Sequence, residues 1–182
     1  MILASCKKET KIKVQSGFNL KMDITDLKGK ITELDTINIW FNHSVCSYHG
    51  YERIEITKDT DSLKIRTEFK EETFDENPKW KIVYEKKITV NDTNWKIEEF
   101  LKRNSNRLNS NEKKYGTLQI SHNEIKLQYF TSGLGDLNKF MVDYFETMIK
   151  LHPENKNGIY GTEVLETKNI SEEIKETELE VN

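Results

Sequence analysis

Hydrophobic and polar residues alternate through most of the first ninety residues, and this period of two is the strongest constraint on the fold. Side chains along a β-strand point to opposite faces in turn, so alternation is typical of strands with one buried face. The pattern predicts strands within 12–24, 37–41, 52–69 and 80–90. A polar turn, Lys58-Asp59-Thr60-Asp61, divides the third stretch and predicts a β-hairpin.

The period then changes to that of a helix. Apolar residues at helical spacing predict one helix from about Ile97 to Leu108 and a second from about Leu134 to Leu151, closed by Pro153. Between them, residues 118–129 predict another hairpin, and 159–165 a last short strand. Parallel pairing would need long crossovers, and few gaps are long enough. We therefore expect an α+β fold, with an antiparallel sheet of about six to eight strands and two helices packed on one face.

Composition bounds the domain organisation. The chain has 182 residues, 35% of them hydrophobic and 32% charged, which suits one domain with a modest core. We expect that domain to span 11–167, after a signal and tether at 1–10 and before an acidic, disordered tail at 168–182. From Glu163 onward the chain has seven glutamates and two lysines, a net charge of −5. Because the whole chain has a net charge of −3, the remaining residues carry +2. A nearly neutral body has no electrostatic footprint for nucleic acid, and none is expected as a partner.

The first residues carry a targeting motif. Leu3-Ala4-Ser5-Cys6 resembles a bacterial lipobox, in which small or aliphatic residues precede a cysteine that receives a lipid. The richness in Lys, Asn, Ile and Glu is similar to that of Bacteroidota envelope lipoproteins. The resemblance implies a lipid on Cys6 and a protein held at the cell envelope, on its periplasmic or its surface side.

The motif is incomplete, which leaves alternatives open. A full signal has a basic start and an apolar run of roughly 7–15 residues, but only five residues precede Cys6. Either Met1 is an internal methionine of a longer signal, or the match is accidental and the protein is a cytosolic interaction protein without lipid. No later segment approaches the ~20 apolar residues of a membrane helix, so Cys6 is the one candidate membrane anchor.

The sharpest candidate for chemistry is a trio at three-residue spacing, His43, Cys46 and His49. Imidazole and thiolate are good ligands for zinc and other transition metals, and this spacing on a loop could bring three ligands together. Structural zinc sites usually take four ligands, however, and no second pair lies nearby. A metal-dependent protein or enzyme built on this trio is thus the alternative, and the main expectation is no metal, no cofactor and no catalytic residue.

Aromatic residues give the remaining hint of function. Trp80, Ile82, Tyr84 and Ile88 share one parity and are expected in the core. Trp40 alternates out of phase with Ile39 and Phe41, so it is expected on the sheet face that the helices leave free. The sequence therefore favours a lipid-anchored, non-catalytic binding module for an unknown protein or small ligand, with Trp40 on its interaction surface.

Overall fold

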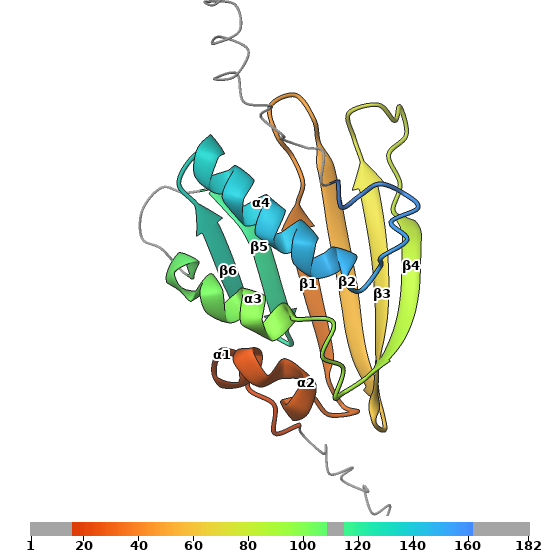
Figure 1. Cartoon of the computed structure of the whole chain (residues 1–182), viewed down its shortest axis with the longest axis vertical. Coiled ribbons are helices and arrows are strands. Elements are labelled where there is room, and N and C mark those ends of the chain that lie inside the picture. The colour runs from red at the N-terminus through yellow and green to blue at the C-terminus, as the bar shows by residue number, and fades with distance from the viewer. Residues whose placement is uncertain (1–15, 109–114, 162–182) are drawn as a thin grey trace, which may run out of the picture.

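The computed structural model describes residues 16–108 and 115–161. Six strands form one antiparallel sheet in the order β4-β3-β2-β1-β5-β6 (Figure 1). The strands are β1 (Thr36–Asn42), β2 (Gly50–Asp59), β3 (Ser62–Glu71), β4 (Lys81–Thr89), β5 (Tyr115–His122) and β6 (Ile125–Thr131). The helices are α1 (Leu20–Asp23), α2 (Leu27–Lys30), α3 (Ile97–Arg103) and α4 (Leu134–Ile149), with the 3₁₀ turns η1 (Ile24–Asp26) and η2 (Ser105–Arg107). The expected α+β fold with an antiparallel sheet is confirmed.

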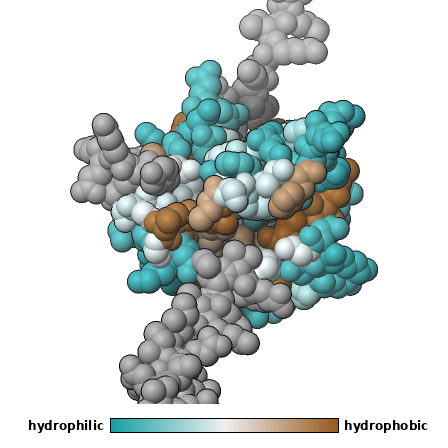
Figure 2. Space-filling view, turned by 90° about the horizontal axis from the view of Figure 1, so that it is seen from above, coloured by the Kyte–Doolittle hydropathy of each residue, from teal (hydrophilic) through white to brown (hydrophobic). Residues whose placement is uncertain are grey.

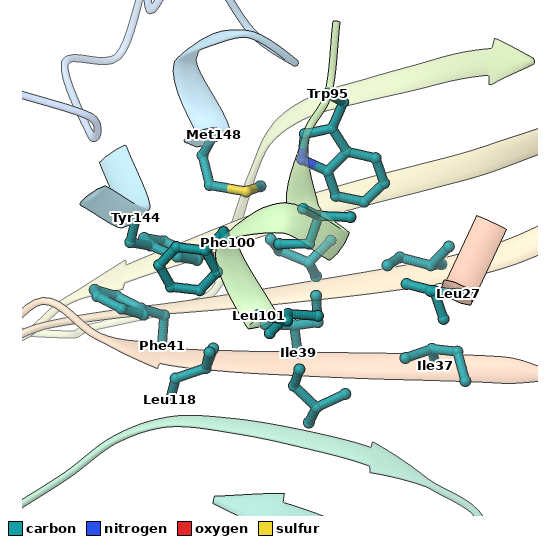
Figure 3. Packing of buried hydrophobic residues seen from close by; sticks show 14 of the residues in the cluster. Leu27, Ile37, Ile39, Phe41, Trp95, Phe100, Leu101, Leu118, Tyr144 and Met148 are labelled. Atoms are coloured by element: carbon teal, nitrogen blue, oxygen red, sulfur yellow. The ribbon is translucent and has the colours of Figure 1, made fainter. Parts of the chain in front are cut away.

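One face of the sheet carries the core. Along β1, Ile37, Ile39 and Phe41 are buried, and the side chains between them point to the opposite face. The helices α3 and α4 lie across the buried face (Figure 1). Figure 3 shows Phe41 packed against Tyr144 of α4, and the two rings stack with centroids 3.8 Å apart. The opposite face, which α3 and α4 leave uncovered, is called the open face below.

Both expected hairpins are present. β2 and β3 pair from Asp59 and Ser62 outward, and Thr60 in the turn between them has a φ of +54°. β5 and β6 pair from His122 and Ile125 outward, with Asn123 at a φ of +52°. Two-residue hairpin turns favour positive φ because their twist then matches that of the strands.

The strand expected within 12–24 is wrong for the residues that the structure describes there. Residues 20–30 form α1, η1 and α2, and the Asn19 side chain caps α1 by accepting a hydrogen bond from the backbone N–H of Lys21. The buried residues are Leu20, Ile24, Leu27 and Ile31, whose spacings of three and four suit a helix. The sequence pattern suggested a strand because the spacing of Leu20 and Ile24 fits a strand as well as a helix. Met22, which a strand would place on the same face as these two residues, is 78% exposed. Helical burial of this set therefore overrides the strand pattern.

The prediction that Trp80, Ile82, Tyr84 and Ile88 all lie in the core is wrong for two of these four residues. Tyr84 is buried and Ile88 packs against the core, but Ile82 is 54% exposed and Trp80 lies beside the open-face residue Arg53. The cause is a β-bulge: Thr67 pairs with Tyr84 while the next residue, Glu68, pairs with Ile82. The extra residue, Val83, shifts the alternation by one position. The bulge thus moves Ile82 and Trp80 to the open face.

The start of α4 is held by an ion pair. The Asp136 carboxylate accepts hydrogen bonds from Arg107 Nη1 at 2.7 Å and from the backbone N–H of Ser132 at 2.8 Å. Mainly through the Arg107 bond, and against the opposing effect of burial, the pKa of Asp136 falls from its usual 3.8 to about 2. The Asp136 carboxylate therefore contributes to the free energy of unfolding. This contribution is present above the usual pKa of 3.8 and is lost as the pH falls from 3.8 toward 2.

Asp136→Asn is accordingly expected to lower the free energy of unfolding at pH 7 by about 1–2 kcal/mol, since solvent weakens a partly exposed pair. The difference from the wild type should shrink as the pH approaches 2. Urea unfolding of both proteins at neutral and acidic pH measures it. An equal difference at both pH values would contradict the assigned role of the carboxylate.

Several expectations fall outside the described residues: the lipid site at Cys6, the segment 1–10 and the tail 168–182. Of the strand expected at 159–165, residues 159–161 are described and form no strand. Within the described ranges, no helix has the length and apolar character needed to cross a membrane.

Candidate functional site

The structure separates the three residues of the proposed metal site. His43 is buried, and its Nε2 lies 3.0 Å from Glu52 Oε2. Cys46 and His49 are exposed on the loop between β1 and β2. Throughout 16–108 and 115–161, no three His, Cys, Asp or Glu side chains are arranged to hold a metal ion. The arrangement therefore gives no support to a metal centre at His43, Cys46 and His49.

A polar cluster is enclosed between the sheet and α4. Glu52 of β2 is fully buried and accepts hydrogen bonds from the Tyr144 hydroxyl at 2.9 Å and from the Tyr160 hydroxyl. The Tyr160 oxygen also lies 2.8 Å from the Tyr84 hydroxyl. Together with His43, these residues are called the Glu52 cluster. Its polar groups satisfy one another, as buried groups must to avoid a large desolvation cost.

The two tyrosine hydroxyls that donate to Glu52 hold their protons firmly. Burial, reinforced by the negative charge of Glu52, raises the pKa of Tyr144 and Tyr160 well above the usual value, so both hydroxyls remain donors. The His43 ring is enclosed by aromatic rings, stacked on Phe145 and edge-on to Phe41 and Phe69. Residues of general acid–base chemistry are thus present, but they face one another inside the core. The cluster joins β2, β4, α4 and the segment after α4.

A second buried cluster contains serine, histidine and aspartate. The Asp35 carboxylate accepts hydrogen bonds from Ser16 Oγ at 2.7 Å, from Thr32 at 2.8 Å and from His122 Nε2 at 2.8 Å. Burial alone would raise the pKa of Asp35, but these hydrogen bonds outweigh it and the pKa is lowered. Ser16 bonds to the carboxylate rather than to the imidazole, so the serine–histidine contact that activates a nucleophile is not formed. The cluster fixes the chain before β1 to the end of β5.

The open face is different, because its aromatic side chains reach solvent. Trp40 of β1 is half-buried and lies on this face, as its phase predicted. Its ring stacks on that of Tyr51 of β2, with centroids 5.7 Å apart and planes inclined by 23°. Offset stacking of this kind is a favoured arrangement of two aromatic rings.

A third aromatic side chain extends this surface toward β4. The Arg53 guanidinium lies 4.4 Å from the centre of the Trp80 ring, and Lys70 Nζ lies 5.2 Å from the Tyr51 ring and 5.5 Å from the Trp80 ring. Trp40, Tyr51 and Trp80 are called the aromatic platform. Cation–π attraction links Arg53 and Lys70 to the rings of Tyr51 and Trp80.

Two adjoining hollows deepen the open face. One, of about 380 Å³, is lined by Asn38, Arg53, Ile54, Glu55, Arg66 and Glu68. The other, of about 480 Å³, runs toward β4 and is lined by Glu55, Thr57, Lys64, Ile65, Arg66, Glu85, Lys86 and Lys87. Arg53 and Arg66 both pair with Glu68, and Lys64 and Lys87 both pair with Asp59. The charges along these hollows are therefore largely compensated within the protein.

A further hollow, of about 570 Å³, lies at the end of the sheet where α4 begins. It is lined by Asn42, Ser44, Val45, Cys46, Gly116, Thr117, Ser132, Gly133, Leu134 and Leu137. Figure 2, which looks down on the molecule from above, shows apolar surface exposed among hydrophilic residues. The Cys46 thiol belongs to this hollow and lies apart from His43.

Sequence reasoning found one residue of the aromatic platform and missed two. Tyr51 could have been found, because it alternates with Glu52 and Ile54 in the same way that Trp40 alternates with Ile39. Trp80 could not, because the bulge in β4 that reverses its face follows from strand pairing rather than from local pattern. The platform therefore emerges only when β1, β2 and β4 are placed side by side.

Comparisons by protein-family model, by curated sequence and by solved structure find no match to this chain. The open face, with its half-buried aromatic side chains, and the enclosed polar clusters are therefore the features that bear on function.

Proposed function

We propose that this protein is a non-catalytic binding module of a bacterial envelope, held there by a lipid on Cys6, and that its open face binds an uncharged polar ligand. The observation that carries the proposal is the aromatic platform. Large aromatic side chains gathered on an exposed face are unusual and mark contact surfaces, whereas single exposed apolar residues are common. Trp40, Tyr51 and Trp80 are gathered in this way: Trp40 stacks on Tyr51, and Arg53 and Lys70 contact the Trp80 ring.

The distribution of reactive groups supports a binding role over a catalytic one. The residues of the two histidine–carboxylate pairs, His43 with Glu52 and His122 with Asp35, are all at most 4% exposed. A substrate would have to open the core to reach them. The open face offers side chains suited to contact, and its ionic groups are paired with one another.

The platform is expected to contribute little to the fold. Exposed cation–π contacts are worth about 0.5–1 kcal/mol, and aromatic pairs about 0.5–1.5 kcal/mol. The double variant Trp40→Ala/Trp80→Ala should therefore lose no more than about 2 kcal/mol of unfolding free energy in a urea titration. If its loss matched that of a fully buried aromatic residue, the platform would be structural and the proposal would fail.

The anchor is tested separately. In the protein produced from its own gene, we expect the mass of the membrane-extracted form to include acyl chains on Cys6, and Cys6→Ser to lack them. Because each buried methylene contributes about 0.8 kcal/mol, several acyl chains hold a protein firmly, and Cys6→Ser should move to the aqueous phase in detergent partitioning. Identical partitioning of the two proteins would exclude the lipid anchor.

A further inference from the structure

Three amide side chains share the open face with Trp40. Gln119 of β5 is directly opposite Trp40 in the sheet register, and Gln128 of β6 is opposite Gln119. Asn38 precedes Trp40 by two positions on the same strand and so shares its face. These three residues are called the amide row. Among the side chains of residues 16–108 and 116–161, the amide row forms no side-chain hydrogen bond.

The amide row has the chemistry to recognise hydroxyl groups. Each amide offers two N–H donors and a carbonyl acceptor, and a hydroxyl both donates and accepts. The nearest charged neighbour of Trp40 in the register is Arg53, which pairs with Glu68 and stacks on Trp80. A charged ligand would have to compete with these pairs, whereas a neutral ligand could leave them in place.

We propose that the ligand of the open face is a neutral carbohydrate chain. A sugar ring has an apolar C–H face that can stack on Trp40, and edge hydroxyls that Asn38 and Gln119 can hydrogen-bond. This inference rests on the proposed function, since it names the ligand of the same surface. The hollow of about 380 Å³ on the open face, whose lining includes Asn38 and Arg53, gives room for the ring substituents.

The spacing of the platform indicates an oligosaccharide rather than a single sugar. Trp40 stands on β1, and Trp80 immediately precedes β4, which is three strands away in the sheet order. Adjacent strands lie about 4.8 Å apart, so the platform extends over roughly 14 Å across the strands. This length accommodates several linked sugar rings running across the sheet, with Tyr51 between the two tryptophans.

Tryptophan fluorescence offers a direct test, because Trp40 and Trp80 reach the open face while Trp95 is 1% exposed in the core. The purified full-length protein is titrated with cellohexaose, laminarihexaose, xylohexaose and mannohexaose, and with hexagalacturonate as the charged counterpart. We expect saturable binding of at least one neutral hexasaccharide and weaker or no binding of hexagalacturonate. Trp40→Ala should weaken that binding by at least about thirty-fold, and Gln119→Ala by about five-fold. Met22→Ala, an exposed change away from the open face, should leave it unchanged.

Each outcome decides between ligands. Binding of no neutral hexasaccharide, or binding that Trp40→Ala leaves intact, overturns the carbohydrate assignment. Tighter binding of hexagalacturonate overturns the neutral character. The panel can also fail while Trp40 and Trp80 are shielded in the intact envelope and a polypeptide crosslinks to position 40. In that case the ligand is a protein, and the open face remains a contact surface. If the panel fails and the tryptophans are unshielded, the proposed function fails with it.

Discussion

Replacing Glu52 by alanine is expected to lower the free energy of unfolding by about 3–5 kcal/mol, among the largest effects of any single substitution in this protein. The carboxylate is fully buried and accepts from Tyr144 and Tyr160, and His43 Nε2 lies 3.0 Å from it. Removing it leaves these groups in the core without their partner. Urea unfolding followed by circular dichroism measures the loss.

Tyr160→Phe provides the matched control for this effect. It removes one hydroxyl, while Glu52 keeps the contacts with His43 and Tyr144, so about 1–2 kcal/mol is expected. A loss below about 1 kcal/mol for Glu52→Ala would show that the cluster does not hold the fold together. A loss for Tyr160→Phe as large as that for Glu52→Ala would show that the segment after α4, rather than the carboxylate, is the critical part.

Phe41→Ala is expected to cost about 3–5 kcal/mol of unfolding free energy, because it opens a cavity at the centre of the core. Phe41 is fully buried between the sheet and α4 and stacks on Tyr144 (Figure 3). Its ring centroid lies 6.1 Å from those of Phe140 and Phe145. Its ring also packs edge-on to His43, so its loss loosens the wall of the Glu52 cluster. The same urea titration measures the effect.

Phe74→Ala tests whether burial, and not aromatic character, sets this cost. Phe74 is 82% exposed between β3 and β4, so its removal should change the unfolding free energy by no more than about 0.5 kcal/mol. Equal losses for Phe41→Ala and Phe74→Ala would contradict the arrangement of layers described above.

The sheet was largely predictable because its local patterns are unambiguous. Ile37, Ile39 and Phe41 could be buried together only on a strand, and the polar turn at Thr60 left β2 and β3 no other pairing than a hairpin. The long amphipathic pattern of α4, ended by Pro153, was equally decisive. Where only one hydrophobic period fits a segment, the sequence alone predicts whether that segment forms a strand or a helix.

The sequence-based predictions failed where a segment fits the period of a strand and that of a helix, or where strand pairing decides which face a residue occupies. Leu20 and Ile24 fit a strand and a helix alike, and both are buried in the helical arrangement, in which η1 packs against α3. The bulge in β4 depends on how Thr67 and Glu68 pair with their neighbours, which no local pattern records. It reverses the face of Trp80 and completes the aromatic platform.

The buried clusters were also beyond the sequence, for a related reason. His43 drew attention through its nearness to Cys46 and His49, but its partner is Glu52, nine residues later on the adjacent strand. The alternation of β2 places Glu52 on the core face with Ile54 and Ile56, where a charged residue is not expected without partners. Its hydroxyl partners, Tyr144 and Tyr160, lie about a hundred residues away in the chain and meet Glu52 only in the folded protein.

The central claim is that the open face is occupied when the protein works, and oxidative footprinting of the three tryptophans tests it most directly. Intact cells and the purified full-length protein are exposed to the same dose of hydroxyl radicals, and oxidation is quantified by peptide mass spectrometry. Trp95, buried in the core, should stay protected in both samples. We predict that Trp40 and Trp80 react readily in the purified protein and are protected in cells. Equal oxidation of Trp40 and Trp80 in the two samples would contradict the claim.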